Sequence, residues 1–315
     1  MHLVRHSNGI RPFEAFMGAY ERLDPGLEHE LVLLFKGFPS AREMEPYRER
    51  ATGAAAGGAP ASVEVSDRGV DLTAYLSAAA ALHHERLCFL NSFSEPVHPG
   101  WLGLLDAALD DPGVGAAGST GSWESGLSYH LFALGFPTAY ANALPGREAA
   151  HIALHEVAGV PYRGPARHAA RVLLSLLTDG FWQSSFPAAH LRTNAFLIDR
   201  ALLLSLRTGD LGGKRAAYRL ESGRRGMTAQ LAARGRPAVV VGRDGRGYRW
   251  RDWPGSETFW RAEQSNLLVS DNQTRRYDAA SEEQRAVMSA IAWGSQAPER
   301  AVAGDRAPQP SSRVE

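Results

Sequence analysis

The stretch Arg86-Leu87-Cys88-Phe89-Leu90-Asn91-Ser92-Phe93-Ser94 decides the fold. It contains an apolar run of strand length that stops at an asparagine and two hydroxyl residues, and Pro96, Pro99 and Gly100 follow shortly after. This pattern predicts a buried strand that delivers polar groups to the carboxyl edge of a sheet. Open α/β sheets bind their ligands at that edge. We therefore place the candidate site there.

The composition is that of an ordinary globular protein. The chain has 315 residues, of which 44% are hydrophobic and 22% charged, enough for a sizeable core. Its 34 basic residues balance 34 acidic ones, so the overall charge provides no attraction to nucleic acid or to an anionic membrane. The single cysteine, Cys88, excludes an internal disulfide and is interpreted as a small buried hydrophobe. Neither a signal peptide nor a transmembrane run is present, so we expect a cytoplasmic protein.

Strand-like and helix-like segments alternate along the chain. Phe13, Phe16, Met17 and Tyr20 recur at helical spacing behind Pro12. Strand signals occur at residues 2–4, 30–35, 63–65, 86–90, 114–118, 195–198 and 238–242. This alternation predicts an α/β fold with a mostly parallel central sheet flanked by helices.

The second half adds an insertion and a tail. Residues from about 126 to 190 have mainly helical periodicity interrupted by prolines, which predicts a helical insertion of the kind that shapes substrate selectivity. Ser281 and Gln284 have the spacing of a capping box for a final helix that ends near Trp293. Residues 297–315 are rich in Pro, Arg, Ser and Ala and predict a disordered tail. We expect residues 1–296 to form a single domain.

Three familiar motifs have weak support. Residues 113–118 match G-x-G-x-x-G, but a helix precedes them and a strand follows, the reverse of a dinucleotide site. A nicotinamide oxidoreductase is therefore the least supported interpretation. His151 and His155, next to Glu156, have a spacing that a metal site can use, but a polar helix face explains them equally well. The G-x-S-x-G motif of a serine hydrolase is absent.

Glu221 is the candidate general base. We expect residues 218–223 to enter a helix that continues through Met227 and Leu231. Glu221 then lies at the mouth of this helix, behind a strand-like approach, and its carboxylate lies beside unpaired amides. A carboxylate there could take a proton from an acceptor hydroxyl. The alternative is a first-turn glutamate that only interacts favourably with the helix dipole.

The order of these segments resembles the GT-A (Rossmann-like) glycosyltransferases of the large inverting family. The resemblance covers roughly residues 1–250 and is closest to the branch that has Leu-Asn-Ser in place of Asp-x-Asp, as in the rhamnan-synthesis-like proteins. The segments that carry it are Asp67-x-Gly69-x-Asp71, Phe89-Leu90-Asn91-Ser92, the Gly-Ser loop after the next strand, Thr193-Asn194-Ala195-Phe196 and Glu221-Ser222-Gly223. It implies a bacterial enzyme of polysaccharide biosynthesis that transfers a sugar from a nucleotide-diphosphate sugar to an acceptor hydroxyl with inversion.

The resemblance also assigns the donor side. It implies contacts between the donor and Asp67, Gly69 and Asp71, and it places Asn91, Ser92 and Ser94 where the metal-binding motif would stand. Asparagine and serine are poor ligands for a hard divalent cation, so we expect transfer without a metal. A Mn or Mg ion is the less favoured alternative, for which Asp244 or Asp271 would be the ligands. Arg224 and Arg225 are then expected to offset the charge that develops on the departing diphosphate.

We expect the acceptor, a glycan or another hydroxyl compound, on the loop 120–125, the insertion and the segment 253–272. Trp123, Trp253 and Trp260 lie in polar stretches where an aromatic face could pack on a sugar, although they could equally pack a lid against the sheet. The expected polar contacts are Glu124, Thr193, Asn194, Gln264, Asn266 and Asn272. A non-catalytic nucleotide-sugar or glycan-binding module is the alternative for the whole protein. The sequence leaves the donor, the acceptor and the oligomeric state open.

Overall fold

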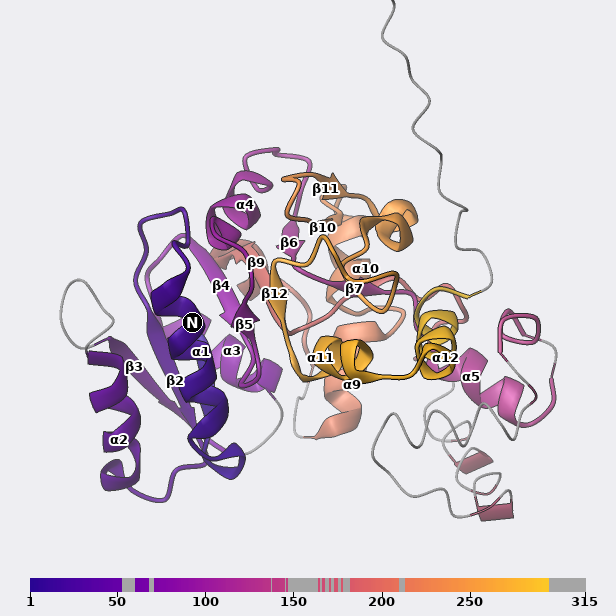
Figure 1. Cartoon of the computed structure of the whole chain (residues 1–315), viewed down its shortest axis with the longest axis horizontal. Helices are drawn as coiled ribbons and strands as arrows, with labels where there is room; N and C mark the ends of the chain where they lie inside the picture. The colour runs from indigo at the N-terminus through magenta and orange to yellow at the C-terminus, as the bar shows by residue number, and fades with distance from the viewer. Residues whose placement is uncertain are drawn as a thin grey trace, which may run out of the picture.

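The centre of the computed structural model is an eight-stranded sheet with the order β11-β10-β6-β9-β4-β1-β2-β3 (Figure 1). The structure describes residues 1–52, 60–67, 71–136, 138–144, 182–209 and 213–294, together with isolated positions between 146 and 177. The strands of the sheet are β1 (His2–Arg5), β2 (Val32–Lys36), β3 (Ala61–Val65), β4 (Arg86–Leu90), β6 (Ala116–Gly118), β9 (Ala195–Asp199), β10 (Ala238–Val241) and β11 (Gly247–Tyr248).

Most strand pairs are parallel. The pairs β1–β2, β1–β4, β2–β3 and β6–β10 run parallel, whereas β9 is antiparallel to both of its neighbours and β11 is antiparallel to β10. The predicted α/β fold with a mostly parallel sheet is therefore confirmed. Because β9 runs against β4 and β6, its first residues lie at the edge where those two strands end.

Helices cover both faces of this sheet. The described helices are α1 (Arg11–Arg22), α2 (Ala41–Thr52), α3 (Asp71–Ala81), α4 (Trp101–Ala107), α5 (Gly126–Ala133), α8 (Arg200–Leu204), α9 (Lys214–Ser222), α10 (Met227–Ala233), α11 (Asn272–Ala279) and α12 (Glu282–Trp293). Two short two-stranded pairs accompany them, β5 (Glu95–Pro96) with β12 (Val269–Ser270), and β7 (Gly121–Ser122) with β8 (His190–Leu191).

Alternating side chains of the strands supply two hydrophobic cores. In β10, for example, Ala238 and Val240 belong to the core beneath α3, α8 and α10, while Val239 and Val241 belong to the core beneath α1, α2 and α4. Successive side chains of a strand point to opposite faces, so an apolar run such as this one must be covered twice. The result is a three-layer arrangement of helices, sheet and helices.

Local sequence signals account for several element boundaries. Ser281 accepts a hydrogen bond from the Gln284 amide while the Gln284 side chain accepts one from the Ser281 amide, so the predicted capping box of α12 is confirmed. Residues 242–246 form a tight connection between β10 and β11, with the Gly242 amide bonded to the Arg246 carbonyl. The G-x-G-x-x-G stretch follows α4 and runs into β6, the predicted order.

The predicted helix through Met227 and Leu231 is present as α10, but the placement of Glu221 at a helix mouth behind a strand-like approach is wrong. Residues 214–222 form helix α9, and Glu221 lies in its last turn. Tyr218 and Leu220 alternate as in a strand, but the segment is rich in Lys, Arg, Ala, Leu and Glu, which have high helix propensity. At the C-terminal end of a helix the dipole disfavours a carboxylate, so other groups must stabilise Glu221.

Some predictions concern residues that the structure does not describe. Helix α5 accounts for the first part of the predicted insertion, while most of the remainder up to residue 181, including His151, His155 and Glu156, lies outside the described residues. Gly69 and the tail 297–315 lie outside them as well. In the described part of the chain, no helix is long and apolar enough to span a membrane.

Candidate functional site

Two antiparallel segments build the wall of the candidate site. Strand β7 pairs with β8, Gly121 opposite Leu191 and Ser122 opposite His190. Hydrogen bonds from the Arg192 amide to the Thr120 carbonyl and from the Ala188 amide to the Trp123 carbonyl extend this pairing in both directions. The segment that follows β6 is thereby fixed against the segment that precedes β9, at the carboxyl edge of the sheet.

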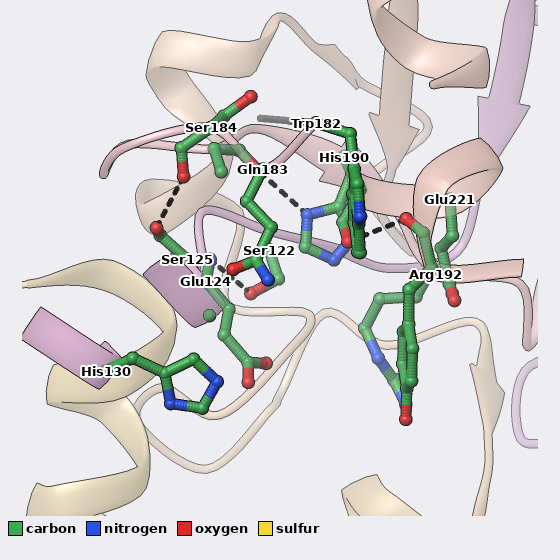
Figure 2. A pocket seen from close by; sticks show the side chains of 14 residues that line it. Ser122, Glu124, Ser125, His130, Trp182, Gln183, Ser184, His190, Arg192 and Glu221 are labelled. Atoms are coloured by element: carbon green, nitrogen blue, oxygen red, sulfur yellow. Dashed lines mark hydrogen bonds between the residues drawn. The ribbon is translucent and has the colours of Figure 1, made fainter. Parts of the chain in front are cut away.

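A cavity of about 440 Å³ opens beside this pair of segments. Its charged and titratable lining consists of Glu124, His130, His190, Arg192, Tyr218 and Glu221. Figure 2 shows the carboxylate of Glu124 and the ring of His130 turned into the open space, with Glu221 and Arg192 on the opposite side. The cavity therefore combines two carboxylates with an arginine and histidines, a set suited to proton transfer and to binding hydroxyl groups.

Thr193 holds the carboxylate of Glu221. The Thr193 hydroxyl donates to Oε1 of Glu221 at 3.0 Å, and the Thr193 amide donates to the same oxygen at 3.3 Å. These donors replace the helix amides that the sequence analysis expected, because Glu221 is at the wrong end of α9 for them. Within the described residues, Oε2 accepts no hydrogen bond, and this half-buried side chain lines the cavity. One oxygen is thus fixed and the other is available to a ligand.

Glu124 has an altered acidity. Glu124 is exposed to solvent at the cavity, but the surrounding walls partly desolvate its carboxylate, which raises its pKa. His190 and Arg192 oppose this effect and lower the pKa of Glu124 electrostatically. The negative charge of Glu221 raises it further. Glu124 and Glu221 therefore interact electrostatically across the cavity.

Arg192 is fixed by a fully buried carboxylate. Its guanidinium lies 2.8 Å from Oδ2 of Asp271, whose side chain is 0% exposed, and it stacks over the ring of Phe259 at 4.1 Å. A further hydrogen bond of 3.4 Å reaches the hydroxyl of Thr120. Asp271 also caps α11 through its other carboxylate oxygen. The positive charge in the cavity is therefore held in one place.

His190 presents a defined face to the cavity. Its Nδ1 lies 2.7 Å from the carbonyl oxygen of Ala188, and because a carbonyl can only accept, this nitrogen carries the proton. In the neutral ring Nε2 is then the acceptor. His190 can thus accept a hydrogen bond from a hydroxyl while Arg192 donates.

A second cluster of charged residues lies at the carboxyl edge of the sheet, where β1, β2 and β3 end. Arg5 pairs with Asp71 at 3.0 Å. The side chain of Lys36 is fully buried, and burial lowers its pKa; Arg5 lowers it further, while Asp71 and Asp67 raise it. Asp67 and Asp71, which the resemblance assigns to the donor, are therefore brought together with two cations. Asp67 follows β3 and Asp71 begins α3, so both lie near the β1–β3 end of the sheet. Strand β4 and its loop separate them from the Glu221 cavity.

The loop after β4 is a compact turn. Oδ1 of Asn91 accepts hydrogen bonds from the Phe93 amide at 2.8 Å and from the Ser94 hydroxyl at 3.1 Å. Ser94 is fully buried and also bonds to the Asn194 carbonyl, and Ser92 is buried. These side chains stabilise the turn. They offer no carboxylate, so this donor set does not fit a hard divalent cation. In the described part of the chain, no group of three or more His, Cys, Asp or Glu residues could hold a metal.

Asp244 and Asp271, the alternative metal ligands, are occupied by protein contacts. Burial tends to raise the pKa of Asp244, but hydrogen bonds from Tyr248, the Arg246 amide and Asn266 outweigh it and lower the pKa. Asp271 is engaged by Arg192 and by the amides at the start of α11.

Arg224 and Arg225 do not line the cavity of Glu221. Both follow α9 and line a different cavity, on the other side of that helix. Arg224 donates through Nε to the Gln183 carbonyl at 2.8 Å. They lie in the turn between the end of α9 at Ser222 and the start of α10 at Met227, so they do not share a helix mouth with Glu221 as expected.

The tryptophans differ in their environments. Trp253 is 0% exposed and its indole donates to the Tyr248 carbonyl, so for this residue the packing alternative is confirmed. Trp260 is also buried, and its indole donates to the Gln273 carbonyl. Trp123 is half-buried between Trp250, Trp293 and Phe186 and donates to the Trp250 carbonyl.

Most of the expected acceptor amides make internal hydrogen bonds. The buried Asn194 accepts from Thr120 at 2.6 Å. Gln264 is buried against Thr274 and Asp278, and Asn266 bonds to Ser256 and Asp244. Asn272 is exposed at the start of α11. Of the predicted acceptor set, only Glu124 lines the cavity, and Thr193 contacts it through Glu221.

Four charged or titratable residues of the site were not predicted. His190, Arg192, Tyr218 and His130 all line the cavity. A signal for the first two was present, since polar residues 190 and 192 flank Leu191, which is 0% exposed. Such alternation places both polar side chains on one face. Tyr218 was assigned to a strand and lies on α9.

The comparisons with known proteins are remote. No protein-family model and no curated protein matches the sequence. Among solved structures, glucosyl-3-phosphoglycerate synthase from Mycobacterium tuberculosis in complex with Mn²⁺, UDP-glucose and phosphoglyceric acid has a TM-score of 0.39 at 16% identity, covering 76% of this chain and 68% of that chain. The same enzyme with Mn²⁺, UDP and glucosyl-3-phosphoglycerate gives 0.38 at 17% identity, with the same coverage. A further mycobacterial protein gives 0.32 at 16% identity over 79% of this chain and 82% of that chain. These scores carry no argument about the activity of this chain.

Proposed function

We propose that this protein is a glycosyltransferase that moves a sugar from a nucleotide-diphosphate sugar to an acceptor hydroxyl with inversion. Glu221 is the general base in this proposal. The observation that carries it is the half-bound carboxylate of Glu221, which lines a cavity of about 440 Å³: Thr193 holds Oε1, and Oε2 accepts no hydrogen bond from the described residues. A base must be oriented and must have a free oxygen within reach of the proton that it takes.

The two ends of the sheet edge suit the two substrates. The nucleotide lies near Asp67 and Asp71, where carboxylates can bind base and ribose groups and Arg5 adds positive charge. The sugar and the acceptor lie in the cavity of Glu221, where Glu124, His190 and Arg192 can bind hydroxyl groups. The turn at residues 91–94 lies between these two regions, at the end of β4. This division follows the motif order on which the resemblance rests.

The reaction is a single displacement. The acceptor hydroxyl gives its proton to Oε2 of Glu221 as its oxygen forms a bond to the anomeric carbon. The bond from that carbon to the diphosphate oxygen breaks at the same time, and the nucleoside diphosphate leaves with the electron pair. Attack on the face opposite the leaving group inverts the anomeric centre, and the transition state has oxocarbenium character as in glycoside hydrolysis.

Fixed positive charge supports the departure of the diphosphate without a metal in this proposal. Arg192 is held by Asp271 and is 15% exposed, and Arg5 is positioned by Asp71. Preorganised cations stabilise developing negative charge because they do not have to reorient during the reaction. The carboxylates that a divalent cation would prefer are missing from the turn at residues 91–94.

A non-catalytic binding module is the second candidate. It is favoured by the turn at residues 91–94, whose side chains bond to each other instead of facing a ligand. Such a module would bind a nucleotide sugar or a glycan without transferring it.

A panel of nucleotide-diphosphate sugars distinguishes these candidates. Thermal shift first identifies the donor, since a ligand that binds the folded state raises the Tm by mass action. The identified donor is then incubated with the protein, and release of the nucleoside diphosphate is followed with and without hydroxyl acceptors. A transferase binds the nucleotide sugar and releases the nucleoside diphosphate. Binding without release supports the module, and binding of no nucleotide sugar contradicts both candidates.

A further inference from the structure

A second cavity, of about 780 Å³, lies across α9 from the cavity of Glu221. Helix α9 contributes Tyr218 and Glu221 to the first cavity and Arg219 and Leu220 to the second. Trp182 lines both. The two cavities are therefore neighbours that share one helix and one aromatic side chain.

The second cavity is strongly basic. Its described lining contains five arginines and no acidic residue; the arginines are Arg207, Arg219, Arg224, Arg225 and Arg234. All five side chains are exposed. We call this space the arginine cavity. In a chain with equal numbers of acidic and basic residues, such a concentration of one sign is a local feature.

Backbone contacts hold part of this cluster in place. The Gln230 side chain accepts a hydrogen bond from the Arg207 amide at 2.8 Å and donates to the carbonyls of Arg207 and Arg225 at 2.9 and 2.8 Å. One side-chain amide thus joins the segment after α8 to the turn before α10. Arg207 and Arg225 are kept close together despite their equal charges.

The guanidinium groups differ in how they are engaged. Arg224 donates to the Gln183 carbonyl, Arg234 donates to the Ser205 carbonyl, and Arg219 lies over the ring of Trp182. The guanidinium groups of Arg207 and Arg225 make no hydrogen bond and no ion pair with any residue that the structure describes. Among the described residues, these carbonyl contacts provide no negative charge to balance the arginines, so an anion would relieve their mutual repulsion.

We propose that the arginine cavity binds an oxyanion of the acceptor, a phosphate or a carboxylate. Arginine suits this ligand because its planar fork of N–H groups matches both groups in a bidentate manner. The concave shape favours a compact anionic group over an extended polyanion. This assignment to the acceptor rests on the proposed function, whereas binding of the anion itself does not.

The position of α9 defines what such an acceptor must look like. Its reacting hydroxyl lies at Glu221 and its anionic group reaches the arginine cavity past Trp182, which lines both spaces. The acceptor class is therefore a hydroxyl compound that carries a phosphate or carboxylate some distance from the reacting hydroxyl. A neutral sugar would leave the arginine cavity unused.

Calorimetric titration of the full chain with inorganic pyrophosphate and, separately, with citrate tests the anion site and distinguishes phosphate from carboxylate. The test variant is Arg207→Gln/Arg225→Gln, because neither guanidinium makes a described contact that the fold would lose. The matched control is Arg11→Gln/Arg42→Gln, which removes the same charge at two exposed arginines of α1 and α2 that have no described ion pair.

The wild type and the control should bind at least one of the two anions, and the test variant should bind it at least about tenfold more weakly, as expected for the loss of charge-assisted hydrogen bonds. Equal affinity in all three proteins, or no binding to the wild type, overturns the anion site. In transfer assays the test variant should raise the KM of acceptors that carry phosphate or carboxylate and leave the KM of neutral acceptors unchanged. An equal change for both classes overturns the assignment to the acceptor.

Glu221→Gln separates this inference from the proposed function. This variant should bind pyrophosphate or citrate as the wild type does. If it also retains full transfer, the proposed function fails while the anion site stands. If transfer is lost in Glu221→Gln but no anion binds to the wild type, the anion site fails while the proposed function stands.

Discussion

The hydroxyl of Thr193 donates a hydrogen bond of 3.0 Å to Oε1 of Glu221, joining the loop before β9 to the last turn of α9. This bond compensates for the unfavourable position of a carboxylate at a helix C-terminus. It also fixes Oε1, while Oε2 accepts no hydrogen bond from the described residues and the side chain lines the cavity. The location of the proposed base therefore depends on a residue 28 positions away in the sequence.

Thr193→Val should lower kcat by about tenfold, because the loss of one charge-assisted hydrogen bond is worth about 1.5–3 kcal/mol and only part of it concerns the orientation of the base. The KM of the donor should remain unchanged, and Thr193→Ser, which keeps the hydroxyl, should restore the rate. Steady-state kinetics of the three proteins check this. Equal losses in the valine and serine variants would show that the hydroxyl has no role.

Asp271→Asn should lower the free energy of unfolding by about 2–3 kcal/mol, because asparagine can still cap α11 but leaves the guanidinium of Arg192 unpaired in a mostly buried place. Urea denaturation measures the change. Asp252→Asn, at an exposed aspartate with no described side-chain contact, is the control and should remain within about 0.5 kcal/mol of the wild type. A similar loss in both variants contradicts the account.

Glu124→Gln should stabilise the protein at neutral pH. The folded state raises the pKa of Glu124 above its ordinary value of 4.5, so it binds the proton more tightly than the unfolded state does. The tighter proton binding stabilises the folded protein fully at pH values below the pKa of Glu124 in the unfolded state. This stabilisation is lost as the pH rises through the pKa of Glu124 in the folded state. The gain in Tm of Glu124→Gln over the wild type should therefore grow from about pH 4.5 upward.

Thermal melts between about pH 4 and 8 measure this difference. Glu49→Gln, at an exposed residue of α2 with no described side-chain contact, controls for the general loss of a negative charge. A gain in Tm for Glu124→Gln that does not change with pH would show that the cavity does not destabilise the ionised form of this carboxylate.

Transfer should survive the removal of divalent cations. Asn91 and Ser94 bond to each other and provide no carboxylate, and Asp271 is engaged by Arg192. Donor turnover with EDTA should match turnover without it. Abolition by EDTA and recovery on addition of Mn²⁺ or Mg²⁺ would require ligands outside the described residues or a rearrangement of this loop.

Local patterns were sufficient to predict most of the fold. The apolar run that ends at Asn91 became the strand β4, and the residues Ser281 and Gln284 formed the capping box of α12. These signals depend on neighbours in the sequence, so they could be recognised without tertiary information. Helix α9 was missed because Tyr218 and Leu220 alternate like strand residues over a short segment, and helix propensity over the whole of residues 214–222 was the better guide.

The site was predictable only in part. Thr193, Glu124 and Glu221 were singled out, and the structure brings Glu124 and Glu221 to one cavity and Thr193 into contact with Glu221. The pairing of Arg192 with Asp271 spans 79 positions, and no local pattern encodes it. Arg225 was placed near Glu221 because it is near in sequence, but the end of α9 directs the two to different cavities. Contacts between residues that are distant in the sequence therefore could not be predicted from local patterns.

The rate of nucleoside diphosphate release by Glu221→Gln, measured with a donor shown to bind, tests the central claim most directly. Glutamine keeps the size of the side chain and an oxygen for Thr193 but cannot take a proton. The account predicts a fall in kcat of about 10²- to 10⁴-fold, an unchanged donor Kd and unchanged circular dichroism. Release at the wild-type rate by the folded variant would contradict the role of Glu221 as the base.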